Sequence, residues 1–147
     1  MDEDIYRETY RRMNPLPCVF EKAILRTCCR CTLAQRLNLA EREAVACTAN
    51  EAQERCRGVL ESLHEKAMFT VRAPHETGPL PHGKEIRIQC GGLLGLSHAM
   101  DDTREIDAVE DVDALLRQAI AHYGDRQGLP YQEIVRAIAA YRNRGRR

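Results

Sequence analysis

The sequence predicts a mainly α fold: a single helical domain with a small two-stranded antiparallel β element. Most segments carry apolar residues at helical spacing, which predicts amphipathic helices. Two short alternating segments, at about residues 68–72 and 85–90, flank a loop rich in Pro and Gly and predict the two strands. The length of 147 residues fits one domain, residues 1–147, with a single core.

Two helices are expected at the start of the chain. Over residues 3–13 apolar side chains recur at the spacing of an amphipathic helix, which Asn14 and Pro15 end. From Pro17 a second apolar stripe predicts a helix that leads into the cysteine-rich stretch at residues 27–34.

Two further helical segments are expected before the strands. Residues 33–47 are rich in Leu, Ala, Arg and Glu, which predicts one helix or two short pieces that meet at Asn38. Thr48 and Glu51 have the spacing of a capping box, so the next helix is expected to run from there to roughly Ala67.

The C-terminal third begins with an acidic stretch, residues 101–113. It leads into a helix over residues 112–124, where the acidic side chains suit the helix dipole and Gly124 provides the stop. A last helix is expected over roughly residues 131–141, and the basic tail 142–147 is expected to be flexible.

Composition narrows the classes of function. The formal net charge is zero, so bulk charge favours neither nucleic acid nor acidic lipid as a partner. No apolar run approaches the roughly 20 residues that span a bilayer, and the N-terminus lacks the order of a signal peptide. We therefore expect a cytoplasmic protein. In that reducing compartment, seven cysteines favour a metal or cluster over a disulfide framework.

The densest group of cysteines is Cys28, Cys29 and Cys31. On a helix or in a turn, Cys28 and Cys31 point to the same side and form a ligand pair. Cys29 is then turned about 100° away from Cys28 and is expected to be a small buried side chain. Cys18, nearly three helical turns earlier, is expected in the core.

Three later cysteines complete the predicted ligand set. Cys47 comes just before a helix start, where free N–H groups and the helix dipole stabilise a thiolate. Cys90 ends the second predicted strand, and Gly91 and Gly92 after it let the backbone approach a cluster closely. Cys56 is expected about 12 Å along the helix that follows Cys47, a separation that suits a cluster better than a single ion.

The predicted cofactor is an iron–sulfur cluster, with 4Fe-4S favoured and Zn as the alternative. The five candidate ligands are Cys28, Cys31, Cys47, Cys56 and Cys90. A single C-x-x-C followed by isolated cysteines does not reproduce the ferredoxin order. Histidines add little, because His75 and His82 fall in the loop between the predicted strands.

The expected function is electron transfer or redox sensing through a protein partner. A structural zinc adaptor is the second hypothesis. A thiol-based redox protein is the third, because Arg26 and Arg30 beside the cysteines would favour a thiolate. Serine-hydrolase, phosphate-loop, dinucleotide and H-E-x-x-H motifs are all missing from the sequence, so no catalytic residue is assigned.

Overall fold

Residues 3–101 and 108–142 are described by a computed structural model, and they form six helices and one antiparallel pair of strands. The mainly α fold with a small β element is thereby confirmed. In chain order the elements are α1 (Glu3–Met13), α2 (Glu21–Leu25), β1 (Ala34–Leu39), β2 (Arg42–Cys47), α3 (Asn50–Val71), α4 (His82–Met100), α5 (Val112–Tyr123) and α6 (Tyr131–Ala140).

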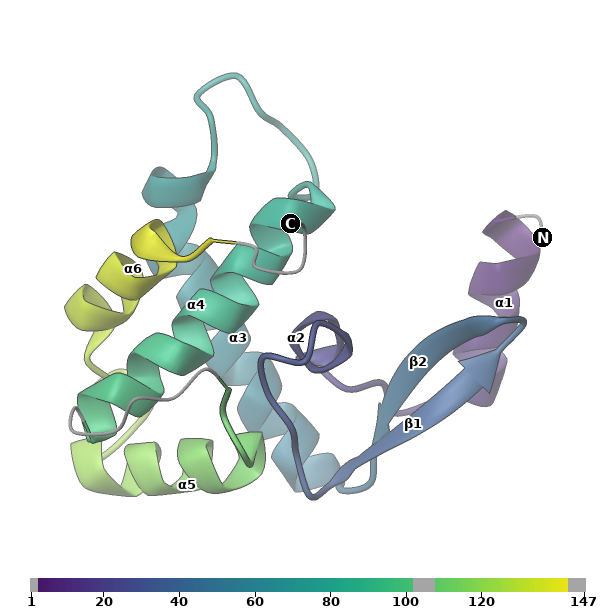
Figure 1. Cartoon of the computed structure of the whole chain (residues 1–147), viewed down its shortest axis with the longest axis horizontal. Coiled ribbons are helices and arrows are strands. Elements are labelled where there is room, and N and C mark those ends of the chain that lie inside the picture. The colour runs from purple at the N-terminus through teal and green to yellow at the C-terminus, as the bar shows by residue number, and fades with distance from the viewer. Residues whose placement is uncertain (1–2, 102–107, 143–147) are drawn as a thin grey trace.

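The elements fall into two groups in space. Helices α3 to α6 pack together on one side, α1 and the β1–β2 hairpin lie on the other, and α2 sits between them (Figure 1). The core runs from Phe20 and Ile24 near α2 through α3 and α4 to Ile134 and Ile138 of α6. The hairpin therefore joins the helical body at the end where α3 begins.

The two strands lie at residues 34–47 and not at 68–90, which corrects the sequence-based placement. Ala34 pairs with Cys47 and Leu39 with Arg42, so only Ala40 and Glu41 form the turn, both with positive φ (52° and 71°). Such turns normally carry Asn-Gly. With Ala and Glu in the turn and helix formers around it, residues 33–47 resemble a helix in sequence.

Contacts with an earlier part of the chain explain why this segment is a hairpin. The Val45 carbonyl accepts hydrogen bonds from the Cys18 N–H at 2.9 Å and from Asn14 Nδ2 at 3.0 Å. The Val45 N–H donates to Glu21 Oε2 at 2.7 Å, and the Cys47 N–H donates to the Leu16 carbonyl at 2.8 Å. These long-range bonds satisfy the outer edge of β2 and override local helix propensity.

The segments predicted as strands, 68–72 and 85–90, form no sheet: residues 68–71 are helical, and Arg72 is the C-cap of α3. Ala67 and Val71 continue the buried face of α3 four residues apart, while Phe69 between them is fully exposed, so the spacing is helical. Residues 85–90 lie inside α4. The predicted capping box is also wrong: the cap residue of α3 is Ala49, and no side chain caps it.

The expected glycine turn after Cys90 is a packing surface within α4. A Cβ at Gly91 would lie 2.8 Å from Ile138 Cα, and one at Gly92 would lie 2.8 Å from Leu63 Cδ1. Gly95 faces α6 in the same way, 2.6 Å from Ala137 Cβ. The glycines thus let α3 and α6 approach α4 closely, which places Cys90 deep between helices.

The predictions for the two ends of the chain are confirmed closely. The helices expected over 3–13, 112–124 and 131–141 are α1, α5 and α6, and Gly124 ends α5 with a φ of 96°. The acidic stretch lies outside the described residues over 102–107, and the basic tail does so over 143–147. No helix among the described residues is long and apolar enough to cross a membrane.

Candidate cysteine-ligated site

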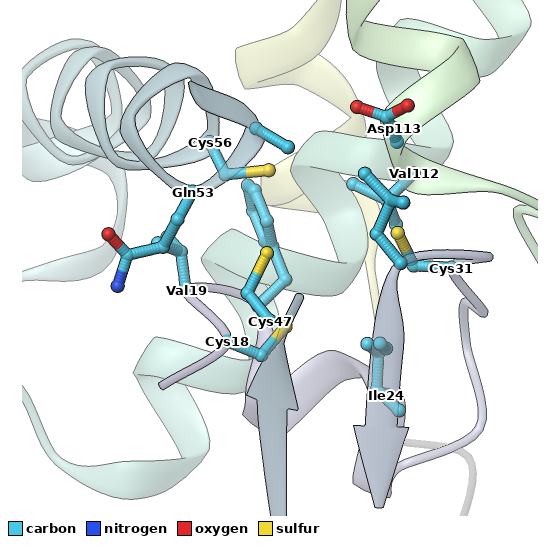
Figure 2. A pocket seen from close by; sticks show the side chains of 13 residues that line it. Cys18, Val19, Ile24, Cys31, Cys47, Gln53, Cys56, Val112 and Asp113 are labelled. Atoms are coloured by element: carbon cyan, nitrogen blue, oxygen red, sulfur yellow. The ribbon is translucent and has the colours of Figure 1, made fainter. Parts of the chain in front are cut away.

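Four unbonded cysteines line one pocket at the junction of the hairpin and the helical body. They are Cys18, Cys31, Cys47 and Cys56, and we call them the thiol pocket. The cavity between them is small, about 20 Å³. In Figure 2, Cys56 reaches from α3 towards the side of Cys31 and Val112, with Cys47 and Cys18 below it.

Each thiol comes from a different segment, and backbone bonds hold the segments together. Cys18 is tied to β2 by its N–H bond to the Val45 carbonyl. Cys47 is the last residue of β2 and pairs with Ala34, which lies three residues after Cys31 in the chain. Gln53 Nε2 of α3 donates to the Pro17 carbonyl at 2.9 Å, next to Cys18. The convergence is therefore built by the hairpin and the first two turns of α3.

Backbone N–H groups point at two of the four sulfurs. The Phe20 N–H donates to Cys18 Sγ, and the N–H groups of Leu33 and Asp113 donate to Cys31 Sγ. Asp113 belongs to the first turn of α5, and the first turn of α3 also lines the pocket. The first turns of both helices thus border the pocket, and their dipoles would favour an anionic group bound there.

Burial favours the protonated form of Cys18, Cys31 and Cys56 by raising the pKa of each. Burial raises the pKa of Cys18 and of Cys56 to about 12, and the neighbouring thiols add to the effect. Burial also raises the pKa of Cys31, although its two N–H donors partly oppose this. A thiol that is a nucleophile needs a lowered pKa, so these values argue against direct thiol catalysis in the pocket.

A buried carboxylate stands at the rim of the pocket. Asp113 is only 8% exposed, and its oxygens pair with Arg55 at 3.1 Å and with Arg117 at 2.9 Å. Arg55 is one residue before Cys56 on α3, so this ion pair joins α3 to α5 across the pocket. Asp111 also acts on Cys31, so two carboxylates, Asp111 and Asp113, stand beside the two guanidinium groups and the charges at the rim balance.

The structure gathers three of the five predicted ligands, Cys31, Cys47 and Cys56, in the thiol pocket. Cys28 and Cys90 instead form a disulfide with their Cα atoms 6.0 Å apart, and a bonded sulfur pair offers no thiolate to a metal. The reason is that residues 28–31 are not helical: they run beside residues 109–112, with Cys29 bridged to Val109, so Cys28 and Cys31 do not have helical spacing.

Cys18 lines the pocket, whereas the predicted ligands Cys28 and Cys90 do not. Its local pattern resembles a core helix, but residues 14–18 are an extended segment beside β2. Only the pairing of that segment with the hairpin reveals Cys18 as a pocket residue, and no local motif signals it. Cys29 is fully buried, as expected.

The geometry bears on the size of the centre. A tetrahedral zinc ion with Zn–S bonds of about 2.3 Å needs its four sulfurs within roughly 4 Å of each other. No three His, Cys, Asp or Glu side chains in residues 3–101 and 108–142 are grouped closely enough to hold a single ion. A cubane cluster carries an iron at each of four corners and takes thiolates that lie farther apart.

No protein-family model, no curated protein and no solved structure matches this chain. The function of this protein must therefore be inferred from the chemistry of the thiol pocket.

Proposed function

We propose that the protein binds a 4Fe-4S cluster through Cys18, Cys31, Cys47 and Cys56, and that it carries electrons or senses redox state with a protein partner. The observation that supports this is the convergence of four unbonded thiols, from four segments, on one pocket. Four thiolates are the ligand set of such clusters. The N–H donors would stabilise the charge of the cluster.

We also propose the cytoplasm as its compartment. Five of the seven cysteines are unbonded, in keeping with surroundings that hold thiols reduced. The pocket lies at the junction of several segments, so a cluster there would stabilise the hairpin against the helical body. Loading would then couple to stability, as it does for other metal sites built from distant segments.

Anaerobic isolation tests the proposal. The expected result is a brown protein with broad visible absorption and with iron and acid-labile sulfide in equal amounts. A colourless protein with one zinc ion per chain would support the structural zinc adaptor and contradict the cluster. If anaerobic reconstitution with iron and sulfide also leaves the protein without metal, the pocket is not a metal site.

A further inference from the structure

Helix α1 carries a row of side chains that the rest of the described chain leaves largely uncovered. Ile5, Thr9 and Met13 are four residues apart, so they lie along one face of the helix, and we call them the α1 row. Ile5 is 53% exposed and Met13 is 57% exposed. Figure 1 places α1 at the end of the molecule opposite helices α3 to α6. The α1 row is therefore open to another molecule.

The neighbouring side of α1 holds the helix to the rest of the protein. Tyr6 and Tyr10 come one position after Ile5 and Thr9, and their ring centroids lie 6.2 Å apart. The Arg42 guanidinium lies 4.2 Å from the centroid of the Tyr6 ring, and the Tyr10 hydroxyl donates to Glu21 Oε2 at 2.9 Å. These contacts fix the direction in which the α1 row faces.

The polar contacts leave α1 short of apolar packing. It has 11 residues, and none of them is buried. A helix of this length is marginal in water, because most helices in proteins are stabilised by packing an apolar face against a neighbour. Burial of the α1 row against a partner would supply that packing.

The charges beside the α1 row favour one kind of partner. Glu8 and Arg12 come one position before Thr9 and Met13, so they form an exposed second row on the side away from the tyrosines. The first turn of α1 is acidic and its last turn is basic. A complementary surface would carry the same charges in the opposite order, and a reversed copy of α1 has that order.

We infer that the α1 row is the contact surface of a homodimer, in which α1 packs antiparallel against α1 of a second copy. A two-fold axis near Thr9 brings Ile5 of each copy to Met13 of the other. The same axis keeps corresponding flanks of the two helices together and reverses their direction, so Glu8 of each copy lies beside Arg12 of the other. A parallel pair would instead bring the two acidic first turns together, which opposes that arrangement.

The size of the surface limits the strength of this dimer. An 11-residue helix is roughly 16 Å long, so one helix pair buries less than the roughly 800 Å² per partner of a standard interface. The dimer is therefore a transient one, formed at chain concentrations of roughly 100 μM and dissociated on dilution.

Sedimentation velocity of the full chain tests the inference over concentrations from about 1 μM to about 1 mM. A reductant is present to prevent disulfides between chains. We expect a monomer at the low end and a dimer at the high end. Ile5→Glu combined with Met13→Glu should keep the chain monomeric throughout, because both changes put a charge into the contact. Circular dichroism checks that the variant remains folded, as expected for side chains that are not buried.

Phe69→Glu is the matched control for these substitutions. Phe69 is 100% exposed on α3, so it is an exposed apolar residue outside the proposed contact. The dimer of this variant should have the native dissociation constant.

Charge reversal tests the antiparallel direction. Glu8→Arg alone places two positive charges side by side at both ends of the contact and should weaken the dimer about tenfold. Arg12→Glu alone should do the same with negative charges. The two changes combined in one chain restore opposite charges across the two-fold axis, so the double variant should regain the native dissociation constant.

Three results would overturn the inference. A native chain that is still monomeric at the highest concentration forms no homodimer, and its α1 row would then serve a different partner. A dimer that survives Ile5→Glu with Met13→Glu uses another surface. A charge-swapped double variant that dimerises no better than the single variants contradicts the antiparallel pairing.

Discussion

The thiol pocket and the Cys28–Cys90 disulfide place the same side chain in different surroundings. The pocket thiols lie where four segments meet, with N–H donors and arginines beside them. The disulfide is buried among apolar side chains, and the pocket cysteines are unbonded. Thus the fold, and not the spacing in the sequence, determines which cysteines stay unbonded.

The largest expected difference between the two regions is in thiol reactivity. Because burial raises the pKa of Cys18 and Cys56 to about 12, their thiolate fraction at neutral pH falls on the order of 1000-fold below that of an ordinary thiol. In the metal-free protein, alkylation of Cys18 and Cys56, followed by mass spectrometry, should be slower by about that factor than alkylation of glutathione. The rate should rise about tenfold per pH unit, since only the thiolate reacts.

Cys28 and Cys90 provide the contrast in the same experiment. Without a reductant they should remain unmodified at every pH, because a disulfide has no thiol to alkylate. Fast modification of Cys18 and Cys56 at neutral pH would contradict the burial of the pocket.

The next effect concerns stability. The disulfide closes a loop with a sequence separation of 62, so replacing both residues with Ser should lower the free energy of unfolding by about 4 kcal/mol in the chain-entropy estimate. Urea unfolding of the metal-free proteins measures it. Repeating the experiment with reductant in both samples is the control, and the gap between native and variant should then close. A gap that persists would show that the substitutions act through core packing.

A smaller effect separates helix packing from the pocket. Gly91→Ala places a Cβ 2.8 Å from Ile138 Cα, and overpacking of this kind costs about 1–3 kcal/mol. Gly58→Ala in α3 is the matched control, because its Cβ meets only the flexible side chain of Arg126. Urea unfolding should find the first variant destabilised and the second near native, both with unchanged metal content. Equal stability of the two would contradict the close approach of α4 and α6.

Local signals predicted some elements of this fold and misled for others. The helices α1, α5 and α6 carry their own apolar period and their stop residues, so the sequence predicts them almost to the residue. The hairpin depends on Val45 bonding to residues 14–21, and its Ala40-Glu41 turn lacks the usual residues. Neither feature can be predicted from the local sequence pattern.

The same holds for the candidate site, where local patterns predict the position of some residues and not of others. The sequence places Cys47 and Cys56 beside one helix, that helix is present, and both cysteines line the pocket. The local pattern assigns Cys18 to the core, because Cys18 reaches the pocket only through the bonding of its segment to Val45, about 27 residues away in sequence. The sequence predicts a turn at Gly91 and Gly92, but both lie inside α4, where they allow neighbouring helices to pack closely. Glycine suits a turn and a close helix contact alike, so the residue type does not distinguish the two.

The central claim is that Cys18 holds the metal centre while Cys28 and Cys90 do not. Iron content per folded chain, measured after identical anaerobic reconstitution, compares Cys18→Ser with the Cys28→Ser, Cys90→Ser double variant, and circular dichroism confirms that both remain helical. We predict near-native iron in the double variant and a loss of most of the iron in Cys18→Ser. Full iron in Cys18→Ser together with its loss from the double variant would contradict the account.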